Sequence, residues 1–425
     1  MSKQNSNIVA IITMCFIFAM ISFVTNMGAP FGNIWGVKYE WAKMLGNMMN
    51  FAAYLFMGIP AGKMLVKIGY KKTALVALAV GVVGLLVQLL SSKVGADVEV
   101  MTYNGQPVAL NLFIYLLGAF ICGFCVCMLN TVVNPMLNIL GGGGNRGNQF
   151  IQIGGSLNSL SGTLTPLLTG VLVGTVTKDT TMSDVAPLLW VGIVVFILSF
   201  VIISFVSIPE PNLKKDGEEI VYERSALAFR HCLLGIIGIF FYVGIEIGIP
   251  AQLNFYITEI PAEGAAAIGG TFAAAYWLLM LCGRFLSSFI SGAVSTKTQI
   301  TAVSSVAILL LLIAIFMPAS ITSDFNGVAV PVKCYFIAAC GLCTSVMWGG
   351  IFNLAVEGLG KYTPQASGLF MMMVVGGGIM PLIQESIAKS VDVISSYWLV
   401  IAMLAYILYY ALVGCKNVNT DIKVD

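Results

Sequence analysis

Hydrophobic residues form long runs along the chain, and polar residues are confined largely to the intervals between them. Runs of roughly 20 apolar residues are long enough for a helix to cross a bilayer. Twelve such runs lie at residues 8–34, 41–66, 73–92, 109–140, 148–176, 184–208, 228–257, 264–291, 298–319, 331–357, 363–390 and 392–414. The pattern predicts an all-α integral membrane protein with twelve transmembrane helices.

One charged segment, PEPNLKKDGEEIVYERSALAFR, separates six runs from the other six. We interpret it as a solvated linker rather than a folded module, because it has no apolar periodicity of its own. The predicted organisation is an N-terminal six-helix bundle at residues 1–208, a cytoplasmic linker at 209–227, a C-terminal six-helix bundle at 228–414 and a cytoplasmic tail at 415–425.

The two halves share short motifs. CGFC at residues 122–125 returns as CGLC at 340–343, Asn134 returns as Asn353, and Gly62-Lys63 returns as Gly283-Arg284. The offset is about 220 residues each time, which is typical of duplicated bundles with a central site between them. We therefore predict two pseudo-symmetric bundles that move a solute by rocking against each other.

Composition and charge agree with a membrane protein, since 58% of the residues are hydrophobic and 9% are charged. The net charge of +2 gives no reason to expect a nucleic-acid partner. With a cytoplasmic N-terminus, fifteen Lys and Arg residues fall on the cytoplasmic side and six on the other. Because basic loops resist translocation, we expect a multi-pass protein of a bacterial inner membrane with both termini in the cytoplasm. No removable signal peptide is expected.

A stripe of amides marks the fourth run. Asn130, Asn134 and Asn138 are four residues apart, so they share one face of a helix. An unpaired amide in hydrocarbon is costly, so this face must contact protein or a polar cavity. We favour the wall of a cavity; the alternative is that the amides only join helices together.

Glu246 is the most informative acid. It lies inside the seventh run with no basic residue nearby in that run, and Asn254 shares its face two turns later. A carboxylate there is a candidate for binding a proton, a cation or a hydroxyl-rich ligand. The alternative is a carboxyl group that reaches the membrane interface.

Two tryptophans, Trp277 and Trp348, fall inside runs rather than at the interfaces where membrane tryptophans usually lie. An indole ring can stack on a sugar ring while amides such as Gln152 and Asn353 bond its hydroxyls. Without such a ligand these side chains are core packing. Both interpretations stay open here.

Enzymatic and metal chemistry find little support. The ten cysteines lie in or beside apolar runs, and the chain has one histidine, His231. We expect no metal site, no cofactor and no catalytic residues, and we interpret the cysteines as small packing residues.

Several motifs resemble those of the fucose-galactose-glucose:proton symporter family, a branch of the major facilitator superfamily. They are NPMLNILG followed by LNSLSG, IPAGKMLVKIGYKK, YVGIE and GGGIMPLIQ. The resemblance covers nearly the whole chain and implies the major facilitator fold. It also implies a conformational loop between the second and third helices, with Gly62, Lys63, Lys67, Gly69 and Lys71. The repeated motif adds Gly283 and Arg284, at the inner end of the eighth helix, to this set.

The chain departs from the pattern of this family at three positions. Asn26 and Asn130 resemble positions where the L-fucose permease has an aspartate and a glutamate, and Gly155 matches a glutamine. Amides bond sugar hydroxyls but carry no proton. Either Glu246 has taken the coupling role, or sodium drives transport, or transport is uncoupled.

The sequence thus predicts a secondary transporter that imports a monosaccharide or sugar derivative by alternating access, coupled to a proton or sodium ion. The alternatives are an uncoupled facilitator or exporter of another polar solute, such as a nucleoside or amino sugar, and a membrane sugar sensor. We expect a monomer in the lipid bilayer. The coupling candidate is Glu246, and the predicted substrate-binding residues are Asn26, Asn130, Asn134, Gln152, Asn158, Glu246, Asn254, Trp277, Trp348, Asn353 and Gln384.

Overall fold

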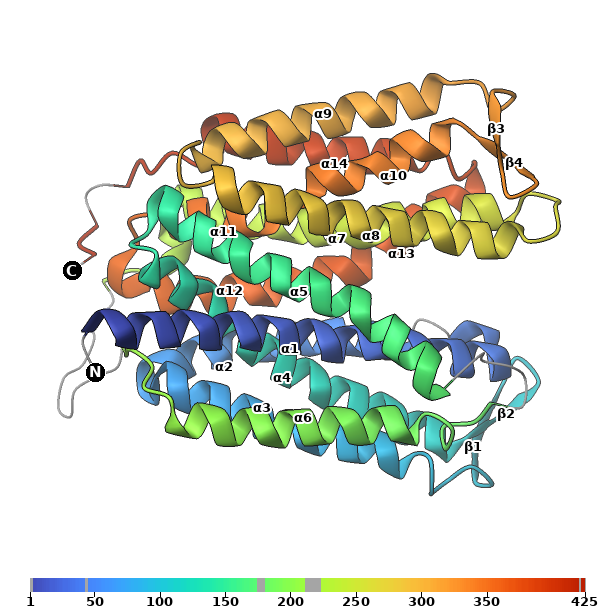
Figure 1. The fold of residues 1–425 in the computed structure, drawn as a ribbon, viewed down its shortest axis with the longest axis horizontal. Helices are drawn as coiled ribbons and strands as arrows, with labels where there is room; N and C mark the ends of the chain where they lie inside the picture. Colours follow the sequence, from blue (N-terminus) through green and yellow to red (C-terminus); the bar gives the residue numbers. More distant parts are fainter. Residues whose placement is uncertain (1–2, 43–44, 174–179, 211–222, 420–421, 425) are drawn as a thin grey trace. The chain divides into compact units, whose positions relative to one another are not determined.

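The structure is a computed structural model of the 425-residue chain, and it describes all residues except 1–2, 43–44, 174–179, 211–222, 420–421 and 425 (Figure 1). Its contacts divide the chain into two compact units. Unit 1 comprises Met1–Met136, Leu160–Ile220 and Ser367–Met372. Unit 2 comprises Leu137–Ser159, Val221–Ala366 and Met373–Asp425. Each unit is described by itself.

Unit 1 is built from helices and one hairpin. Its elements are α1 (Lys3–Lys38), η1 (Glu40–Ala42), α2 (Leu45–Lys67), α3 (Gly69–Leu90), β1 (Glu99–Tyr103), β2 (Gln106–Ala109), α6 (Ala186–Phe205), most of α4 (Leu110–Leu140) and the second half of α5 (Gly144–Val173). The short α12 (Thr363–Met372) contributes its last turns.

Unit 2 holds the later helices together with the end of α4 and the first half of α5. Its elements are η2 (Ala226–Ala228), α7 (Arg230–Thr258), α8 (Ala265–Ile290), α9 (Thr296–Phe316), β3 (Thr322–Phe325), β4 (Val328–Pro331), α10 (Lys333–Thr344), α11 (Met347–Val356), η3 (Gly360–Tyr362), η4 (Met373–Val375), α13 (Gly376–Ser390), α14 (Tyr397–Tyr409) and η5 (Tyr410–Gly414). Helix α7 packs against α8, α11, α13 and α14.

The predicted helical membrane fold is confirmed. Eleven helical segments of the described residues are long and apolar enough to cross a membrane, and each coincides with a predicted run. The run predicted at 148–176 corresponds to α5, which has 30 residues but carries amides and hydroxyls along much of its length. Residues 174–176 of that run lie outside the described residues.

Two β-hairpins interrupt the helices, and the sequence analysis did not predict them. Strands β1 and β2 pair antiparallel between α3 and α4, and β3 and β4 pair between α9 and α10. Each turn is an Asn-Gly pair with positive φ, at Asn104-Gly105 and Asn326-Gly327. Asn-Gly is the strongest short hairpin signal. Its recurrence at the same place in both halves supports the predicted duplication.

The run predicted as one helix at 331–357 is divided in two. Helix α10 ends at Thr344 and α11 begins at Met347, so Ser345 and Val346 lie between helices. A break of this kind exposes backbone carbonyls that need new hydrogen-bond donors. The Ser345 carbonyl receives one from Arg284, and the Val346 carbonyl receives one from Gln152.

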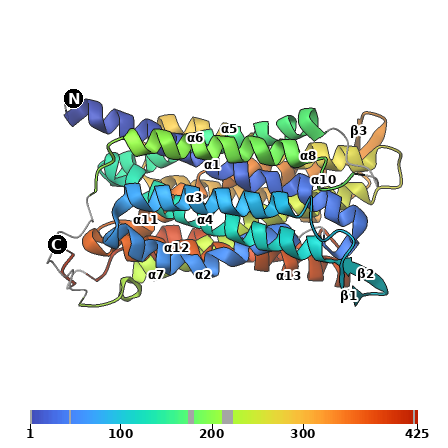
Figure 2. The same cartoon turned by 90° about the horizontal axis from the view of Figure 1, so that it is seen from below.

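Helices α3, α4 and α6 of unit 1 lie next to one another (Figure 2), and small residues allow them to approach closely. A side chain at Gly84 of α3 would meet the Cys122 sulfur of α4, and one at Gly81 would meet Cys125 and Phe196. Both cysteines are buried. The interpretation of this CxxC pair as packing residues therefore agrees with the structure, because close packing stabilises helices where lipid offers no hydrophobic drive.

The contact units differ from the predicted bundles. Residues 137–159 belong to unit 2 and 367–372 to unit 1, whereas the predicted boundary separates residues 1–208 from 228–414. Hydrogen bonds of the 137–159 segment explain the difference: Asn138 donates to Asn353 at 2.6 Å and Gln149 donates to the Ser288 carbonyl at 3.0 Å. The predicted bundle boundaries stay a prediction, and residues 211–222 of the linker lie outside the described residues.

Glu210 caps helix α3 from far along the chain. Its carboxylate accepts hydrogen bonds from the backbone N–H groups of Tyr70 and Lys71, at 2.6 and 2.9 Å. These are among the N–H groups that a helix start leaves unpaired, and a negative charge is favourable there. The cap joins the end of α6 to the start of α3.

We expect Glu210→Ala to lower the free energy of unfolding by about 1–2 kcal/mol, since it removes a charged cap from two backbone donors. A lower midpoint of thermal unfolding of the purified protein would show this. Glu223→Ala is the control, because Glu223 is an exposed acid of the same charged segment. Equal midpoints for both variants would contradict the capping role.

Candidate functional site

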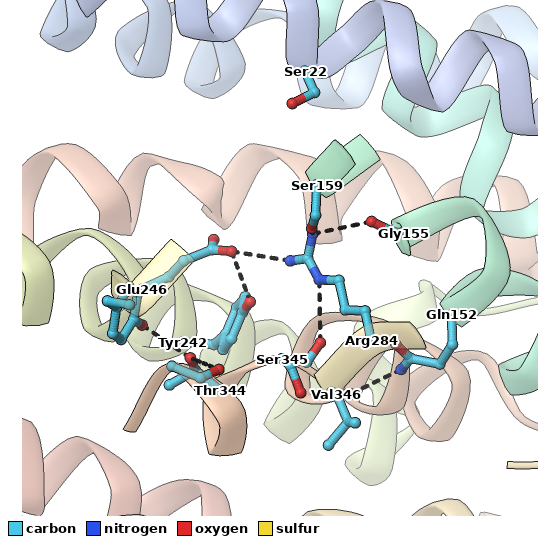
Figure 3. Close-up of polar contacts among 12 residues, drawn as sticks. Ser22, Gln152, Gly155, Ser159, Tyr242, Glu246, Arg284, Thr344, Ser345 and Val346 are labelled. Carbon is cyan, nitrogen blue, oxygen red and sulfur yellow. Dashed lines mark hydrogen bonds and ion pairs between the residues drawn. The ribbon is translucent and has the colours of Figure 1, made fainter. Parts of the chain in front are cut away.

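An ion pair lies at the centre of the polar groups of unit 2 (Figure 3). Arg284 Nη2 of α8 is 3.1 Å from Glu246 Oε1 of α7, and the two side chains are 10% and 14% exposed. A buried charge is tolerated only when it is paired and hydrogen-bonded. No basic residue of its own run lies near Glu246, and its partner comes from the next helix, 38 residues along the chain.

Arg284 bonds three further groups on two other helical segments. Its Nη1 donates to the Ser159 hydroxyl at 2.8 Å and to the Gly155 carbonyl at 3.4 Å, both on α5. Its Nε donates to the Ser345 carbonyl at 3.2 Å, at the break between α10 and α11. One guanidinium group therefore holds α5, α7 and the α10–α11 break together.

Gly155 gives the Arg284 side chain its space. A Cβ atom at position 155 would lie 3.5 Å from Arg284 Cδ and 3.9 Å from Nε. A single methyl group would only touch the arginine, but a longer side chain would displace it. Gly155, where the family pattern has a glutamine, therefore leaves the space that the Arg284 side chain occupies.

Aromatic residues surround the pair. The Tyr242 hydroxyl donates to Glu246 Oε1 at 2.9 Å, and the Trp348 ring lies edge-on to Tyr242 with 6.2 Å between the centroids. Tyr276 is fully buried and shares a hydrogen bond of 2.9 Å with Thr344. Trp348 therefore lies beside Tyr242, the residue that bonds Glu246.

Trp277 lies at the border of this cluster, where its ring is edge-on to Tyr276 with 5.5 Å between the centroids. Its side chain is 38% exposed, whereas its neighbour Tyr276 is the buried aromatic of α8. Adjacent residues of a helix point about 100° apart, and hydropathy alone does not say which of two aromatics faces inward.

Two amides of the predicted stripe, Asn130 and Asn134, lie in unit 1, whereas Asn138 belongs to unit 2. Asn130 donates to the Tyr54 hydroxyl at 3.0 Å, Asn134 donates to the Asn130 carbonyl at 2.8 Å, and both are buried. Asn26 of α1 donates to the carbonyl of Ser22 at 2.8 Å. The predicted stripe thus faces protein groups, and Tyr54 is a partner that the sequence analysis missed.

Two predicted ligands bond protein groups of unit 2. Gln152 donates to the Val346 carbonyl at 3.1 Å. Asn353 donates to the Thr296 hydroxyl at 3.0 Å and accepts the bond from Asn138. These amides join helices in this conformation, which is the alternative that the sequence left open. Asn158 lies half-buried on α5, one residue before Ser159.

Asn254 and Gln384 lie away from the ion pair. Asn254 accepts a hydrogen bond of 3.4 Å from Thr258, near the end of α7. Gln384 of α13 is fully buried and donates to the Ser396 hydroxyl at 3.4 Å. The structure does not bring either amide to Glu246.

The predicted conformational loop after the second helix is a tight turn. Helix α2 ends at Lys67 and α3 begins at Gly69, whose φ of +85° is one that glycine adopts freely. Gly62 and Lys63 lie within α2, and Lys71 lies in the first turn of α3, where its amine donates to the Ser204 carbonyl at 2.7 Å.

Gly283 and Arg284, the predicted echo, lie inside α8 and near its end at Ile290. Gly62 and Lys63 lie in the same way near the end of α2. The role of these residues in a conformational change stays a prediction.

A small polar cavity of unit 1 was also missed. It has a volume of about 20 Å³, enough for roughly one water molecule. Its polar lining includes Thr25, Asn47, Asn50, Gln88 and Tyr115. The amides of α2 and α3 were the available signal. Among the described residues, no three His, Cys, Asp or Glu side chains lie close enough together to hold a metal ion.

The family follows from comparison with known proteins. The family model described as Major Facilitator Superfamily matches residues 8–382. The chain belongs to this superfamily. It is an integral, multi-pass membrane transporter and not an enzyme.

Relatives match this superfamily member over almost its whole length. The glucose/galactose transporter of Brucella abortus (strain 2308) is 27% identical and aligns over 98% of this chain and 96% of its own. A putative glucose/galactose transporter of Helicobacter pylori (strain 26695) is 24% identical, over 98% and 99%. The L-fucose-proton symporter of Escherichia coli K12 is 21% identical, over 96% and 93%. The resemblance to the symporter family is confirmed.

Solved structures share the fold. The E. coli fucose:proton symporter FucP matches with a TM-score of 0.78 and 17% identity, over 96% of this chain and 98% of its own. The proton:xylose symporter XylE matches with a TM-score of 0.72 and 9% identity, over 97% of both chains.

The contact between α8 and α10 beside Arg284 leads to a prediction for this transporter. A Cβ atom at Gly283 would meet the Ser345 side chain and would lie 2.8 Å from the Leu342 carbonyl. We expect Gly283→Ala to separate α8 from α10 and to lower both the thermal unfolding midpoint and the transport rate.

Gly270→Ala is the matched control on the same helix, because a Cβ atom there meets nothing within 4 Å. It should be neutral or stabilising by roughly 0.5–1 kcal/mol, as alanine favours helix over glycine. A Gly283→Ala protein as stable and active as Gly270→Ala would contradict the close approach.

Proposed function

We propose that this transporter imports a monosaccharide or sugar derivative by alternating access, coupled to a proton or a sodium ion. The observation that carries the proposal is the buried Glu246–Arg284 pair, bordered by Tyr242 and Trp348. The names of the relatives, glucose/galactose transporter and L-fucose-proton symporter, support the same solute class.

The ion pair favours a neutral solute. Glu246 and Arg284 together carry no net charge, so a charged solute would gain no compensating partner and would lose its hydration. A sugar has many hydroxyls that can both donate and accept hydrogen bonds, and the carboxylate and guanidinium provide an acceptor and donors side by side. The edge and face of Trp348 add an apolar surface for a sugar ring.

The amides of unit 1 are further proposed ligands of the sugar. A side-chain amide can make up to four hydrogen bonds. Asn130 can therefore keep its bond to Tyr54 while it accepts from a sugar hydroxyl. We assign Asn26, Asn130 and Asn134 this role in the conformation that binds the solute.

The proposal also covers the oligomeric state, the membrane, the orientation of the chain and the coupling residue. The transporter acts as a monomer in a bacterial inner membrane. Both of its termini lie in the cytoplasm, an orientation that the distribution of Lys and Arg favours. Glu246 is the coupling residue, since a membrane-embedded carboxylate can hold a proton or a sodium ion.

An uncoupled facilitator is the second candidate. Its support is that the Glu246 carboxylate already has a cationic partner in Arg284. A carboxylate that remains paired throughout the cycle would bind no further cation, and the solute would only equilibrate.

Sugar uptake by proteoliposomes tests the proposal. Radiolabelled glucose, galactose and fucose are supplied under an imposed proton gradient, a sodium gradient or neither, with protein-free liposomes as the control. We expect one gradient to drive accumulation of a hexose above equilibrium. Equilibration under all conditions would favour the facilitator, and no flux of any sugar would contradict the proposed solute class.

Asn130→Ala should weaken sugar binding. We expect a rise in KM of roughly three- to tenfold, the value of one hydrogen bond, with the response to the gradient unchanged. Asn111→Ala is the control, because Asn111 is a buried amide at the other end of the same helix. An unchanged KM in Asn130→Ala would exclude Asn130 from the site.

A further inference from the structure

We infer that Arg284 is the residue through which a cation at Glu246 controls the position of helix α5. The inference rests on the proposed function and deepens it, because it names the side chain that transmits cation binding. It starts from the position of the guanidinium group, which bonds Glu246 of α7 at one end and Gly155 and Ser159 of α5 at the other (Figure 3).

The charge of Glu246 holds this arrangement together. A guanidinium group has five N–H donors. In this structure Arg284 uses them on one carboxylate and on three neutral acceptors, at Ser159, Gly155 and Ser345. Only the carboxylate compensates its positive charge. A cation that neutralises Glu246 leaves a buried arginine without a counter-charge, which is strongly unfavourable.

The carboxylate has a position for that cation. Tyr242 and Arg284 both donate to the same oxygen of Glu246, Oε1. The other oxygen, Oε2, can therefore take a proton or coordinate a sodium ion before either bond breaks. The titratable and charged groups that face Glu246 are Tyr242 on its own helix and Arg284 and Tyr276 on α8.

Movement of Arg284 changes its hydrogen bonds to Gly155 and Ser159 of α5. Its side chain passes the Cβ-free position of Gly155, so the guanidinium group can shift without a steric barrier from that residue. Gln149 and Gln152 also join α5 to other segments of unit 2, through the carbonyls of Ser288 and Val346. Both are uncharged, so their bonds do not respond to the charge of Glu246, whereas the bonds of Arg284 do.

Neutralisation of Glu246 therefore weakens the contact of α5 with α7 and α8 and makes its separation easier. A proton and a sodium ion share this effect, and the ionic conditions of the experiment distinguish them. Arg284 acts in this scheme as a positioning residue for the cation response of the transporter.

The test compares two kinds of transport in proteoliposomes. Exchange of labelled for unlabelled sugar at equal concentrations needs no coupling, whereas accumulation against a gradient does. One coupled proton and a gradient of one pH unit allow about tenfold accumulation. The variants are Glu246→Gln, Arg284→Gln, Arg284→Lys and the double variant Glu246→Gln with Arg284→Gln, each assayed with proton or sodium gradients.

Glu246 and Arg284 are also proposed contacts of the sugar, so we expect Arg284→Gln and Glu246→Gln to exchange sugar more slowly. Both should lose accumulation, and the exchange that remains should no longer depend on pH or sodium. Arg284→Lys keeps the charge without the planar fork and should recover part of the accumulation. Arg230→Gln is the matched control, because Arg230 is an exposed arginine at the start of α7. It should behave as the unmodified protein.

The double variant guards against misfolding. Glu246→Gln alone leaves an unpaired buried arginine and can unfold the protein. Removal of both charges should restore the thermal unfolding midpoint toward that of the unmodified protein, while accumulation stays lost.

Two results would overturn the inference. One is an Arg284→Gln protein that accumulates sugar with an unchanged profile against pH or sodium. The other is a parallel loss of exchange and accumulation in both Arg284 variants with that profile unchanged, which would indicate a merely structural residue. If the unmodified protein exchanges no sugar, the proposed function fails. The role of Arg284 is then decided by the response of thermal unfolding to pH and sodium, which Arg284→Gln should abolish.

Discussion

The structure of unit 2 depends on the cost of placing two charges in a low-dielectric interior. Glu246 and Arg284 are each acceptable there only because they face each other and because the remaining donors of the guanidinium group find acceptors. That requirement explains several features that seem unrelated along the chain. A carbonyl must point at Nε, a hydroxyl and another carbonyl must approach Nη1, and α5 must come close enough to supply them. The ion pair thus sets the distance between four helical segments, and its strength depends on the state of one carboxylate.

The chain meets this requirement at a few positions, where a helix is interrupted or where a glycine replaces a larger side chain. The break between α10 and α11 leaves carbonyls at Ser345 and Val346 that side chains of other helices can reach. Gly155 lacks the side chain that would occupy the space of Arg284, and Gly283 lets α8 lie directly against α10. In a membrane such breaks are tolerated where protein groups satisfy the freed backbone. The polar amides that line these contacts add hydrogen bonds between helices, and they make the contacts of α5 with unit 2 specific.

Sequence patterns singled out residues that the structure brings together, but not all of their neighbours. Glu246 and Trp348 were selected because a carboxylate and an indole ring are unusual in apolar runs, and the structure places them together around Tyr242. Arg284 was selected for a repeated motif at the inner end of the eighth run, and its pairing with Glu246 was not expected. Trp277 was selected, whereas its neighbour Tyr276, which is the buried one, was not. Both gaps concern the direction in which a helical side chain points. A helix bordered by lipid on one side and protein on the other is apolar all round, so its hydropathy does not reveal that direction.

The sequence by itself determined the class of this protein. Twelve apolar runs, the charged interval after the sixth and the repeated motifs were enough for a membrane transporter with two related halves, because the length and apolarity of a spanning helix follow from the thickness of the bilayer. The Asn-Gly hairpins were also available from the sequence, since that dipeptide favours one turn geometry. Only the tertiary structure decided which polar groups meet. The pairing of Glu246 with Arg284, the assignment of residues 137–159 to unit 2 and the cap of α3 by Glu210 all join residues far apart in the chain. Such contacts depend on how helices rotate and pack against each other, and no local pattern of residues contains that information.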